Sequence, residues 1–294
     1  MDKALISLLL IYLLSFTSSC VQLGQSNSDY QNALEAIIDG RRGSAMDYLD
    51  DQLKKDIYHI DARFIRAKIL LEDGDYRQAL FDVTFAIDNY NRRANVTESS
   101  LYALQGDIYI EDYNFKYAAD SYKEAVKLAL KDNPDKVHNY RFLLAQSLYF
   151  IDDYEGAEAV YNSMLEDNPE DYPAMVGLAR NLRDQEKYEE ALAILDEVEQ
   201  LDSDYDAVYK FKMQIYDLMG RTFDSVDAAL TYYDLDEEAD LEIVTEYLVN
   251  EPSYAIERIR ERIKEGYDTD RWSALLHSIY QVQKNISDAM FWNI

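Results

Sequence analysis

The side chains that could act as nucleophiles, general bases or metal ligands are few and widely separated. The 294-residue chain has one Cys and three His; His59, His138 and His277 lie far apart, and Cys20 lies near the start. One Cys excludes a disulfide framework, and this set leaves almost no ligands for a structural zinc site. The sequence also contains no HExxH, GxSxG, GxGxxG or phosphate-loop motif. We therefore expect a non-enzymatic protein with no cofactor and no metal.

The charge balance excludes one large class of partner. Asp and Glu number 57 against 29 Lys and Arg, which gives a net charge of −28. A general basic surface for nucleic acid is therefore excluded, because phosphate binding needs many cations. Acidic runs such as residues 234–242 lack the Gly and the spacing of a calcium loop, and we interpret them as solvated surface. With 48% apolar residues and only four Pro, the chain has enough material for a packed core.

The start of the chain predicts export. A short charged start precedes the apolar run 4–16, which is shorter than the ~20 residues of a bilayer-spanning helix, so we predict a signal peptide at 1–19. Cys20 follows small residues and resembles the lipobox of bacterial lipoproteins, in which this Cys is acylated, although Thr17 stands where that family usually has Leu. The resemblance implies a lipidated Cys and a polar tether at 20–28. Ordinary signal-peptidase cleavage, which would leave a free thiol, is the alternative.

The rest of the chain consists of one repeated unit. Small residues occur in pairs twelve apart, and the second members follow one another at intervals of 34 or 39 residues. Turn-forming residues at 91–100 and 131–139 account for the two longer intervals. The pattern continues less regularly to Met213 with Ser225, and then to Ile243 and His277, each twelve residues before an Ala. The five clear pairs are Ala33 with Ala45, Ala67 with Ala79, Gly106 with Ala118, Ala145 with Ala157, and Ala179 with Ala191.

Each unit is predicted to form two helices. In segments such as 100–112, apolar residues recur at three and four positions, which is the spacing of a helix with one buried face. A break follows, and a second periodic segment then begins. The paired small residues would allow the two helices to approach closely. In four units an aromatic residue lies three positions before the second small residue, namely Tyr76, Phe115, Tyr154 and Tyr188.

These residues resemble the tetratricopeptide repeat, a 34-residue helix-turn-helix with small residues at its eighth and twentieth positions. The best copy is 138–171, where the matching residues are Ala145, Leu148, Tyr154, Ala157, Tyr161 and Pro169. The resemblance is clearest at 60–205 and implies an all-α solenoid over 29–294, with about six to eight repeats stacked into a superhelix.

The resemblance further implies a concave groove lined by the first helix of each unit and occupied by a protein partner. Arg180, Arg183 and Lys210 would bring cations together there. They predict a pocket for a carboxylate or an acidic peptide end; the alternative is pairing with local carboxylates such as Asp184. The expected groove residues are Phe64, Lys68, Asp107, Phe142, Gln146, Tyr149, Val176, Arg180, Arg183, Lys210 and Gln214.

The 26 Tyr residues also allow two interpretations. Tyr is enriched at interfaces, so Tyr149 and its neighbours would contact a partner. Most Tyr residues, however, occupy core-like periodic positions, among them Tyr109, Tyr122, Tyr161 and Tyr188, and we expect packing to account for the majority.

Our leading hypothesis is a bacterial envelope adaptor, held through Cys20 at a membrane, expected to be the outer membrane with the protein facing the periplasm. Proteins of this kind assist assembly of outer-membrane, pilus, secretion or polysaccharide-export machines, and the resemblance does not choose among these. One alternative is an extracytoplasmic glycan- or peptide-binding protein. Another is a secreted protein without a lipid.

Overall fold

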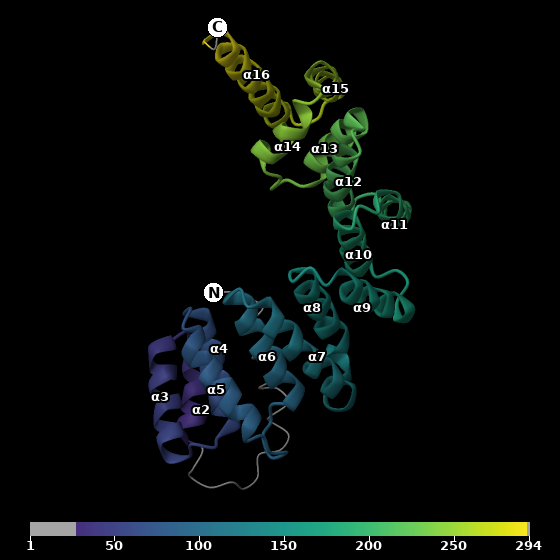
Figure 1. Ribbon diagram of the computed structural model, residues 1–294. Coiled ribbons are helices and arrows are strands. Elements are labelled where there is room, and N and C mark those ends of the chain that lie inside the picture. Colours follow the sequence, from purple (N-terminus) through teal and green to yellow (C-terminus); the bar gives the residue numbers. More distant parts are fainter. Residues whose placement is uncertain (1–27, 293–294) are drawn as a thin grey trace. The chain divides into compact units, whose positions relative to one another are not determined.

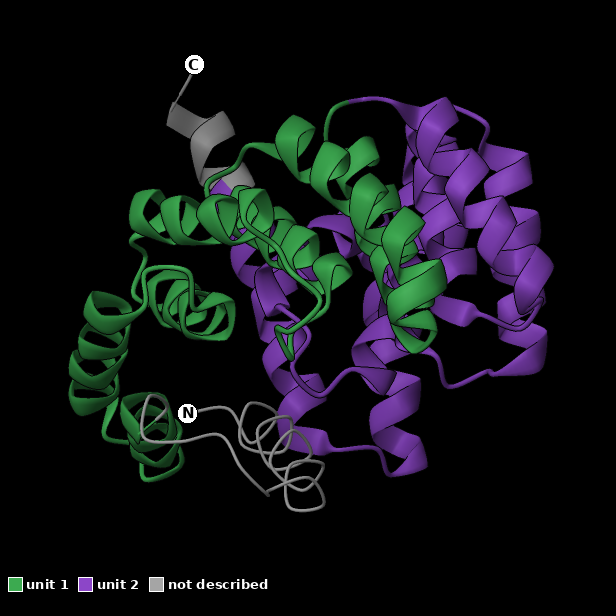
Figure 2. Cartoon of the chain, turned by 90° about the horizontal axis from the view of Figure 1, so that it is seen from below, with its two compact units in different colours: residues 1–151 green, residues 152–294 purple. Residues whose placement is uncertain are grey.

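The computed structural model describes the backbone of residues 28–292 and the side chains of residues 28–285. The described backbone forms fifteen α-helices and one short 3₁₀ helix and contains no strand, which confirms the predicted all-α fold class. The chain divides into two compact units, residues 1–151 and 152–294 (Figure 2). The predicted signal peptide, Cys20 and nearly all of the tether lie outside the described residues. No helix in the described part combines the length and apolar character needed to cross a bilayer.

In the first unit, neighbouring helices in the chain pack on one another from α2 to α8 (Figure 1). The helices α2 and α3, α4 and α5, and α6 and α7 form antiparallel hairpins, each of which is one repeat. Because α4 also contacts α6, the first helices of these two repeats lie next to each other. The elements are α2 (Ser28–Ile38), α3 (Arg42–Lys55), α4 (Ile60–Glu72), α5 (Tyr76–Asp88), α6 (Glu98–Glu111), α7 (Phe115–Asp132), η2 (Pro134–Lys136) and α8 (Val137–Tyr149).

In the second unit, α9 and α11 flank α10, α12 packs on α13, and α10 also contacts α12. The last helices depart from simple hairpins, because α13 contacts both α14 and α15, and α16 packs on the same two helices. The elements are α9 (Tyr154–Asp167), α10 (Tyr172–Asp184), α11 (Tyr188–Leu201), α12 (Asp206–Leu218), α13 (Thr222–Leu235), α14 (Leu241–Leu248), α15 (Pro252–Glu265) and α16 (Thr269–Trp292).

The paired small residues lie in the helix packing, as the sequence predicted. All ten members are buried, and nine of the ten are Ala residues with no exposed surface. Beyond Ser225 the prediction holds only in part. Ala255 is fully buried, but its partner Ile243 is 44% exposed and His277 is exposed, whereas Val244 and Ile279 are buried. The helix α14 has only eight residues, so the 34-residue spacing no longer points the same positions inward.

A residue with left-handed backbone conformation lies in the turn before each of the six helices α3, α5, α7, α9, α11 and α13. It lies two residues before the second helix each time, and its positive φ reverses the chain direction in a short loop. Gly occupies three of these positions and larger residues the other three. The second helices α5, α7, α9 and α11 begin at the four aromatic residues noted in the sequence. The six left-handed residues are Gly40, Gly74, Tyr113, Asp152, Glu186 and Gly220.

The two predicted loop insertions take different forms. The first is a loop between α5 and α6 that is held by Asp61, a buried carboxylate accepting hydrogen bonds from the backbone of Asn95 and Val96 (2.9 and 2.8 Å). The second, expected at 131–139, is mostly helical: α7 continues to Asp132 and η2 leads directly into α8. The Pro at the start of η2 fits, because the first turn of a helix needs no N–H donor there.

Candidate partner-binding surfaces

The first unit brings together Phe64, Lys68 and Asp107 from the first helices α4 and α6. Phe64 and Lys68 lie one turn apart, and the Lys68 ammonium is 5.5 Å from the centre of the Phe64 ring. Burial raises the pKa of the Asp107 carboxyl above its ordinary value, and the Tyr122 hydrogen bond and the charge of Lys68 offset only part of this effect. These three groove residues therefore form one cation, aromatic and carboxylate cluster.

A glycine allows the second helix to support this cluster. A Cβ on Gly106 would lie 2.8 Å from the Tyr122 ring, so only Gly lets the ring from α7 lie against α6. The Tyr122 hydroxyl then donates a hydrogen bond of 2.6 Å to Oδ1 of Asp107. Burial and the neighbouring carboxylate raise the pKa of Tyr122, so it remains a protonated donor. Sequence reasoning identified Gly106 as small but did not anticipate this bond.

The last helix of the first unit contributes another row. Phe142, Gln146 and Tyr149 follow helical spacing on α8 and are each half-buried. Tyr149 meets the edge of Phe150 at 5.5 Å between ring centres, and Phe150 stacks on Phe115 at 4.6 Å. This row is thus continuous with an aromatic group at the end of the hairpin.

The second unit joins Arg183 and Gln214 directly. Nη1 of Arg183 donates to Oε1 of Gln214, which links α10 to α12. Nε of Arg183 donates to Asp184 at 2.6 Å, and the guanidinium lies 5.5 Å from the centre of the Phe211 ring. The pairing with Asp184 is the local alternative considered from the sequence. Arg183 is therefore a paired cation whose remaining surface lies beside an amide and an aromatic ring.

Lys210 lies one helical turn before Gln214 and is exposed. Its ammonium is 5.7 Å from the centre of the Tyr232 ring, and it has no ion-pair partner within the described part of the chain. Tyr232 donates to Asp236 at 2.8 Å, and burial together with this carboxylate raises the pKa of Tyr232 to about 12. Arg180 lies on α10 and is partly exposed, whereas Val176 is buried with only 7% of its surface exposed.

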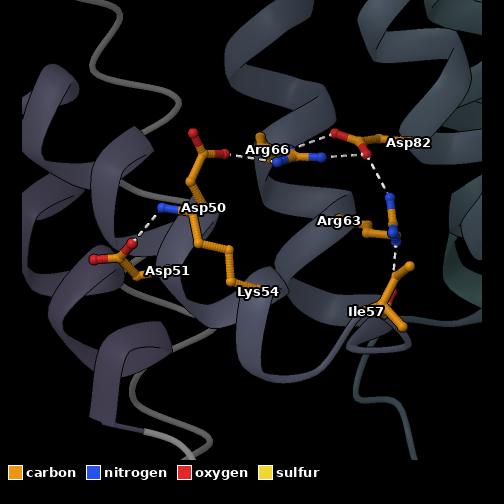
Figure 3. Close-up of polar contacts among 7 residues, drawn as sticks. All are labelled: Asp50, Asp51, Lys54, Ile57, Arg63, Arg66 and Asp82. Atoms are coloured by element: carbon orange, nitrogen blue, oxygen red, sulfur yellow. Dashed lines mark hydrogen bonds and ion pairs between the residues drawn. The ribbon is translucent and has the colours of Figure 1, made fainter.

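A buried ion cluster in the first unit was missed by sequence reasoning (Figure 3). Arg63 on α4 donates from Nη1 to Oδ1 of Asp82 on α5 at 2.7 Å, and these side chains are 4% and 0% exposed. Arg66 binds both oxygens of Asp82, each at 2.7 Å, and also binds Asp50 on α3 at 2.6 Å. The cluster joins three consecutive helices. Nothing in the spacing of these residues distinguishes them from the many surface charges.

His59 and His277 each contact neighbouring side chains or backbone. Nδ1 of His59 accepts a hydrogen bond from the backbone of Ala62 at 3.1 Å and so caps α4, and its ring lies 4.8 Å from that of Tyr30. His277 pairs with Gln281 on the same helix. Among the described residues, no group of three or more His, Cys, Asp or Glu is arranged to hold a metal ion.

Comparison with known proteins agrees with this geometry. Residues 143–215 match the family model described as tetratricopeptide repeat. The search of curated proteins gave no match. A tetratricopeptide repeat protein from Parabacteroides merdae has a TM-score of 0.65 at 16% identity, and the alignment covers 87% of this chain and 100% of that one.

Two other solved structures also share the fold. PilW, described as a widely conserved type IV pilus biogenesis factor, has a TM-score of 0.56 at 14% identity, covering 74% of this chain and 97% of its own. PilF from Pseudomonas aeruginosa has a TM-score of 0.53 at 14% identity, covering 73% and 93%. At these identities the likeness concerns the fold. Residues 143–215 therefore match the tetratricopeptide repeat, and the chain has the fold of a tetratricopeptide-repeat protein.

Proposed function

We propose that this protein is a non-enzymatic scaffold whose first helices bind segments of partner proteins. Helical repeats of this kind form extended binding surfaces because each repeat contacts only its neighbours. The observation that carries the proposal is the group on α10 and α12, where Arg183 bonds to Gln214 and Lys210 remains exposed one turn away. Such a group offers charged and amide donors beside aromatic rings, which suits a protein segment ending in or bearing a carboxylate.

The composition of the groove residues in the two units favours a protein adaptor over the glycan-binding alternative. The described groove residues mix Lys, Arg, Asp and Gln with Phe and Tyr, and the aromatic rings of Phe64 and Phe211 are each covered on one side by a cation. A sugar site would need rings open for stacking. A protein partner, in contrast, uses charged and apolar contacts together.

We further propose that the scaffold acts in the cell envelope, held at the outer membrane by acylated Cys20. The sequence of the first twenty residues supports this placement, and the likeness of fold to a type IV pilus biogenesis factor supports a pilus machine among the candidate assemblies. In this arrangement the lipid attaches the chain to the membrane, and the tether lets the repeats extend away from the membrane surface.

The lipid anchor is tested by fatty-acid labelling of the full chain expressed in a bacterium that has an outer membrane. The native chain should carry label and fractionate with membranes, and Cys20→Ala should carry none and appear in the soluble fraction. Label that persists in Cys20→Ala, or an unlabelled native chain, would reject the anchor.

The groove is tested separately by affinity purification from solubilised membranes. Lys210→Glu reverses an exposed charge on the first helix α12, and Lys264→Glu reverses an exposed charge on α15 as the matched control. We expect a protein recovered with the native chain and with Lys264→Glu to be lost from Lys210→Glu. An identical set of proteins with all three chains would count against the proposed groove.

A further inference from the structure

A patch of large apolar side chains is exposed on the first unit, and it includes none of the groove residues on α4, α6 and α8. We call it the Phe81 patch; it consists of Ile57 and Tyr58, in the turn before α4, and Phe81 and Phe85, one turn apart on α5. Tyr58 is 59% exposed, Phe81 57% and Ile57 52%. Phe85 lies at its centre, with ring-centre distances of 5.7 Å to Tyr58 and 6.4 Å to Phe81. Contiguous exposed apolar surface of this kind marks interaction sites.

A buried cation holds the patch from beneath. The Arg63 guanidinium lies 3.8 Å from the centre of the Phe85 ring and 5.8 Å from that of Phe81. Its Nε donates to the Ile57 carbonyl at 2.9 Å, and its Nη1 is bonded to Asp82 (Figure 3). Arg63 thus contacts both the turn and α5 that form the patch. Because the rings are fixed before any partner arrives, little side-chain entropy remains to be lost on binding.

The charges around the patch determine what it suits. Asp56 precedes Ile57, and Asp88 lies one turn after Phe85 on α5; both carboxylates are exposed, and neither has an ion-pair partner in the described part of the chain. The opposite end of the same helix carries Arg77, one turn before Phe81. An apolar centre with unpaired carboxylates at one side complements an apolar side chain flanked by Lys or Arg.

We propose that the Phe81 patch docks a basic segment of another protein, anchored by a large apolar side chain over Phe81 and Tyr58, with its cations toward Asp56 and Asp88. A second copy of this chain suits the patch less well, because two chains of charge −28 repel each other. The patch contains none of the groove residues on α4, α6, α8, α10 and α12, so this second protein-binding surface goes beyond the proposed groove.

The test is selection of random short peptides on the purified chain, with counter-selection on a Tyr58→Ser/Phe81→Ser variant. Phe223→Ser is the matched control, since Phe223 is 54% exposed on α13. Recovered peptides should carry a large apolar residue beside Lys or Arg. They should bind the native chain and Phe223→Ser equally, and the double variant about tenfold or more weakly, as expected for an interface hot spot. Asp88→Asn should weaken them less, and Lys210→Glu should leave them unchanged, which separates this result from the groove test.

Four results would overturn the proposal. These are peptides that are acidic or uncharged; no peptide that distinguishes the native chain from the double variant; dimers in sedimentation equilibrium that Phe81→Ser abolishes; and glycan binding that the double variant loses. Thermal unfolding of each variant checks that the exposed substitutions leave the fold intact.

Discussion

The hydroxyl of Tyr122 on α7 donates a 2.6 Å hydrogen bond to the Asp107 carboxylate on α6. This bond connects a second helix, which provides support, to a carboxylate on the first-helix row. It depends on Gly106, because the ring crosses the backbone of α6 where any Cβ would intrude. The repeat thus uses a small residue to place a polar group, as well as to bring two helices close together.

Gly106→Ala should destabilise the first unit. The added Cβ would lie 2.8 Å from the Tyr122 ring. Overpacking of this kind costs about 1–3 kcal/mol, and Ala regains ~1 kcal/mol of helix propensity, so we expect a net loss of up to about 2 kcal/mol. Gly43→Ala is the control, because its Cβ would meet nothing within 4 Å. Urea unfolding should show a loss for Gly106→Ala and none for Gly43→Ala. Equal effects of the two substitutions would contradict the packing account.

Asp107 should make stability depend on pH with a definite sign. Because its pKa is raised in the folded chain, the folded state retains the proton longer than the unfolded state does. Stability therefore falls as pH rises from the unfolded pKa of about 3.9 to the folded value, and remains lower above it. Asp107→Asn, which retains an acceptor for Tyr122, should be more stable than the native chain at neutral pH.

The measurement is the difference in free energy of unfolding between Asp107→Asn and the native chain. The advantage of the variant should shrink as pH is lowered from neutral toward the unfolded pKa of about 3.9. A difference that stays constant from neutral pH down to about 3.9 would show that the folded pKa of Asp107 is not raised.

Asp82→Ala should strongly destabilise the first unit. It leaves Arg63, 4% exposed, without its carboxylate, and breaking a buried ion pair costs about 3–5 kcal/mol. Asp51→Ala is the matched control, because its pair with Lys54 is open to solvent (Figure 3). Thermal unfolding should show a large fall in Tm for Asp82→Ala and no measurable change for Asp51→Ala. A small effect at Asp82 would mean that water or other groups solvate Arg63.

Sequence reasoning predicted the fold well wherever side-chain volume carries the information. The burial of Ala79, Ala118, Ala157 and Ala191 followed from one spacing, because close helix packing tolerates only small residues there. It did not anticipate that Ile243 is 44% exposed. The short helix α14 shifts which positions of the repeat face the core, and no residue in the sequence indicates that this helix is shorter.

The candidate surfaces were predicted less completely. Phe64, Lys68 and Asp107 were placed on one surface by the repeat numbering, and the structure brings them together. Arg63 and Asp82 were not singled out, because a buried pair and a surface pair have the same residue types and only three-dimensional packing separates them. Most Tyr residues were expected in the core, but only six of the described Tyr residues are buried. Tyr122 and Tyr161 are among them, whereas Tyr109 and Tyr188 are half-buried. Tyr58 is 59% exposed, since its place in a turn follows no helical period.

The left-handed turns predict opposite effects of opposite substitutions. Gly74 has a φ of 77° and open space around its Cβ, so Gly74→Ala tests backbone strain alone and should cost about 1–2 kcal/mol. Glu186 has a φ of 62°, and Glu186→Gly should gain up to about 1 kcal/mol after the entropy of Gly is subtracted. Urea unfolding checks both. A loss of stability in Glu186→Gly would mean that its side chain contributes more than its backbone strain costs.

Site-specific photo-crosslinking in intact membranes tests whether the first helices form the protein-binding surface. A benzophenone side chain is placed at Lys210 on α12, or at Phe223, 54% exposed on the second helix α13. We predict a discrete protein adduct from position 210 and none from position 223. A protein adduct from 223 with none from 210, or adducts from 210 that contain only glycan, would contradict the account.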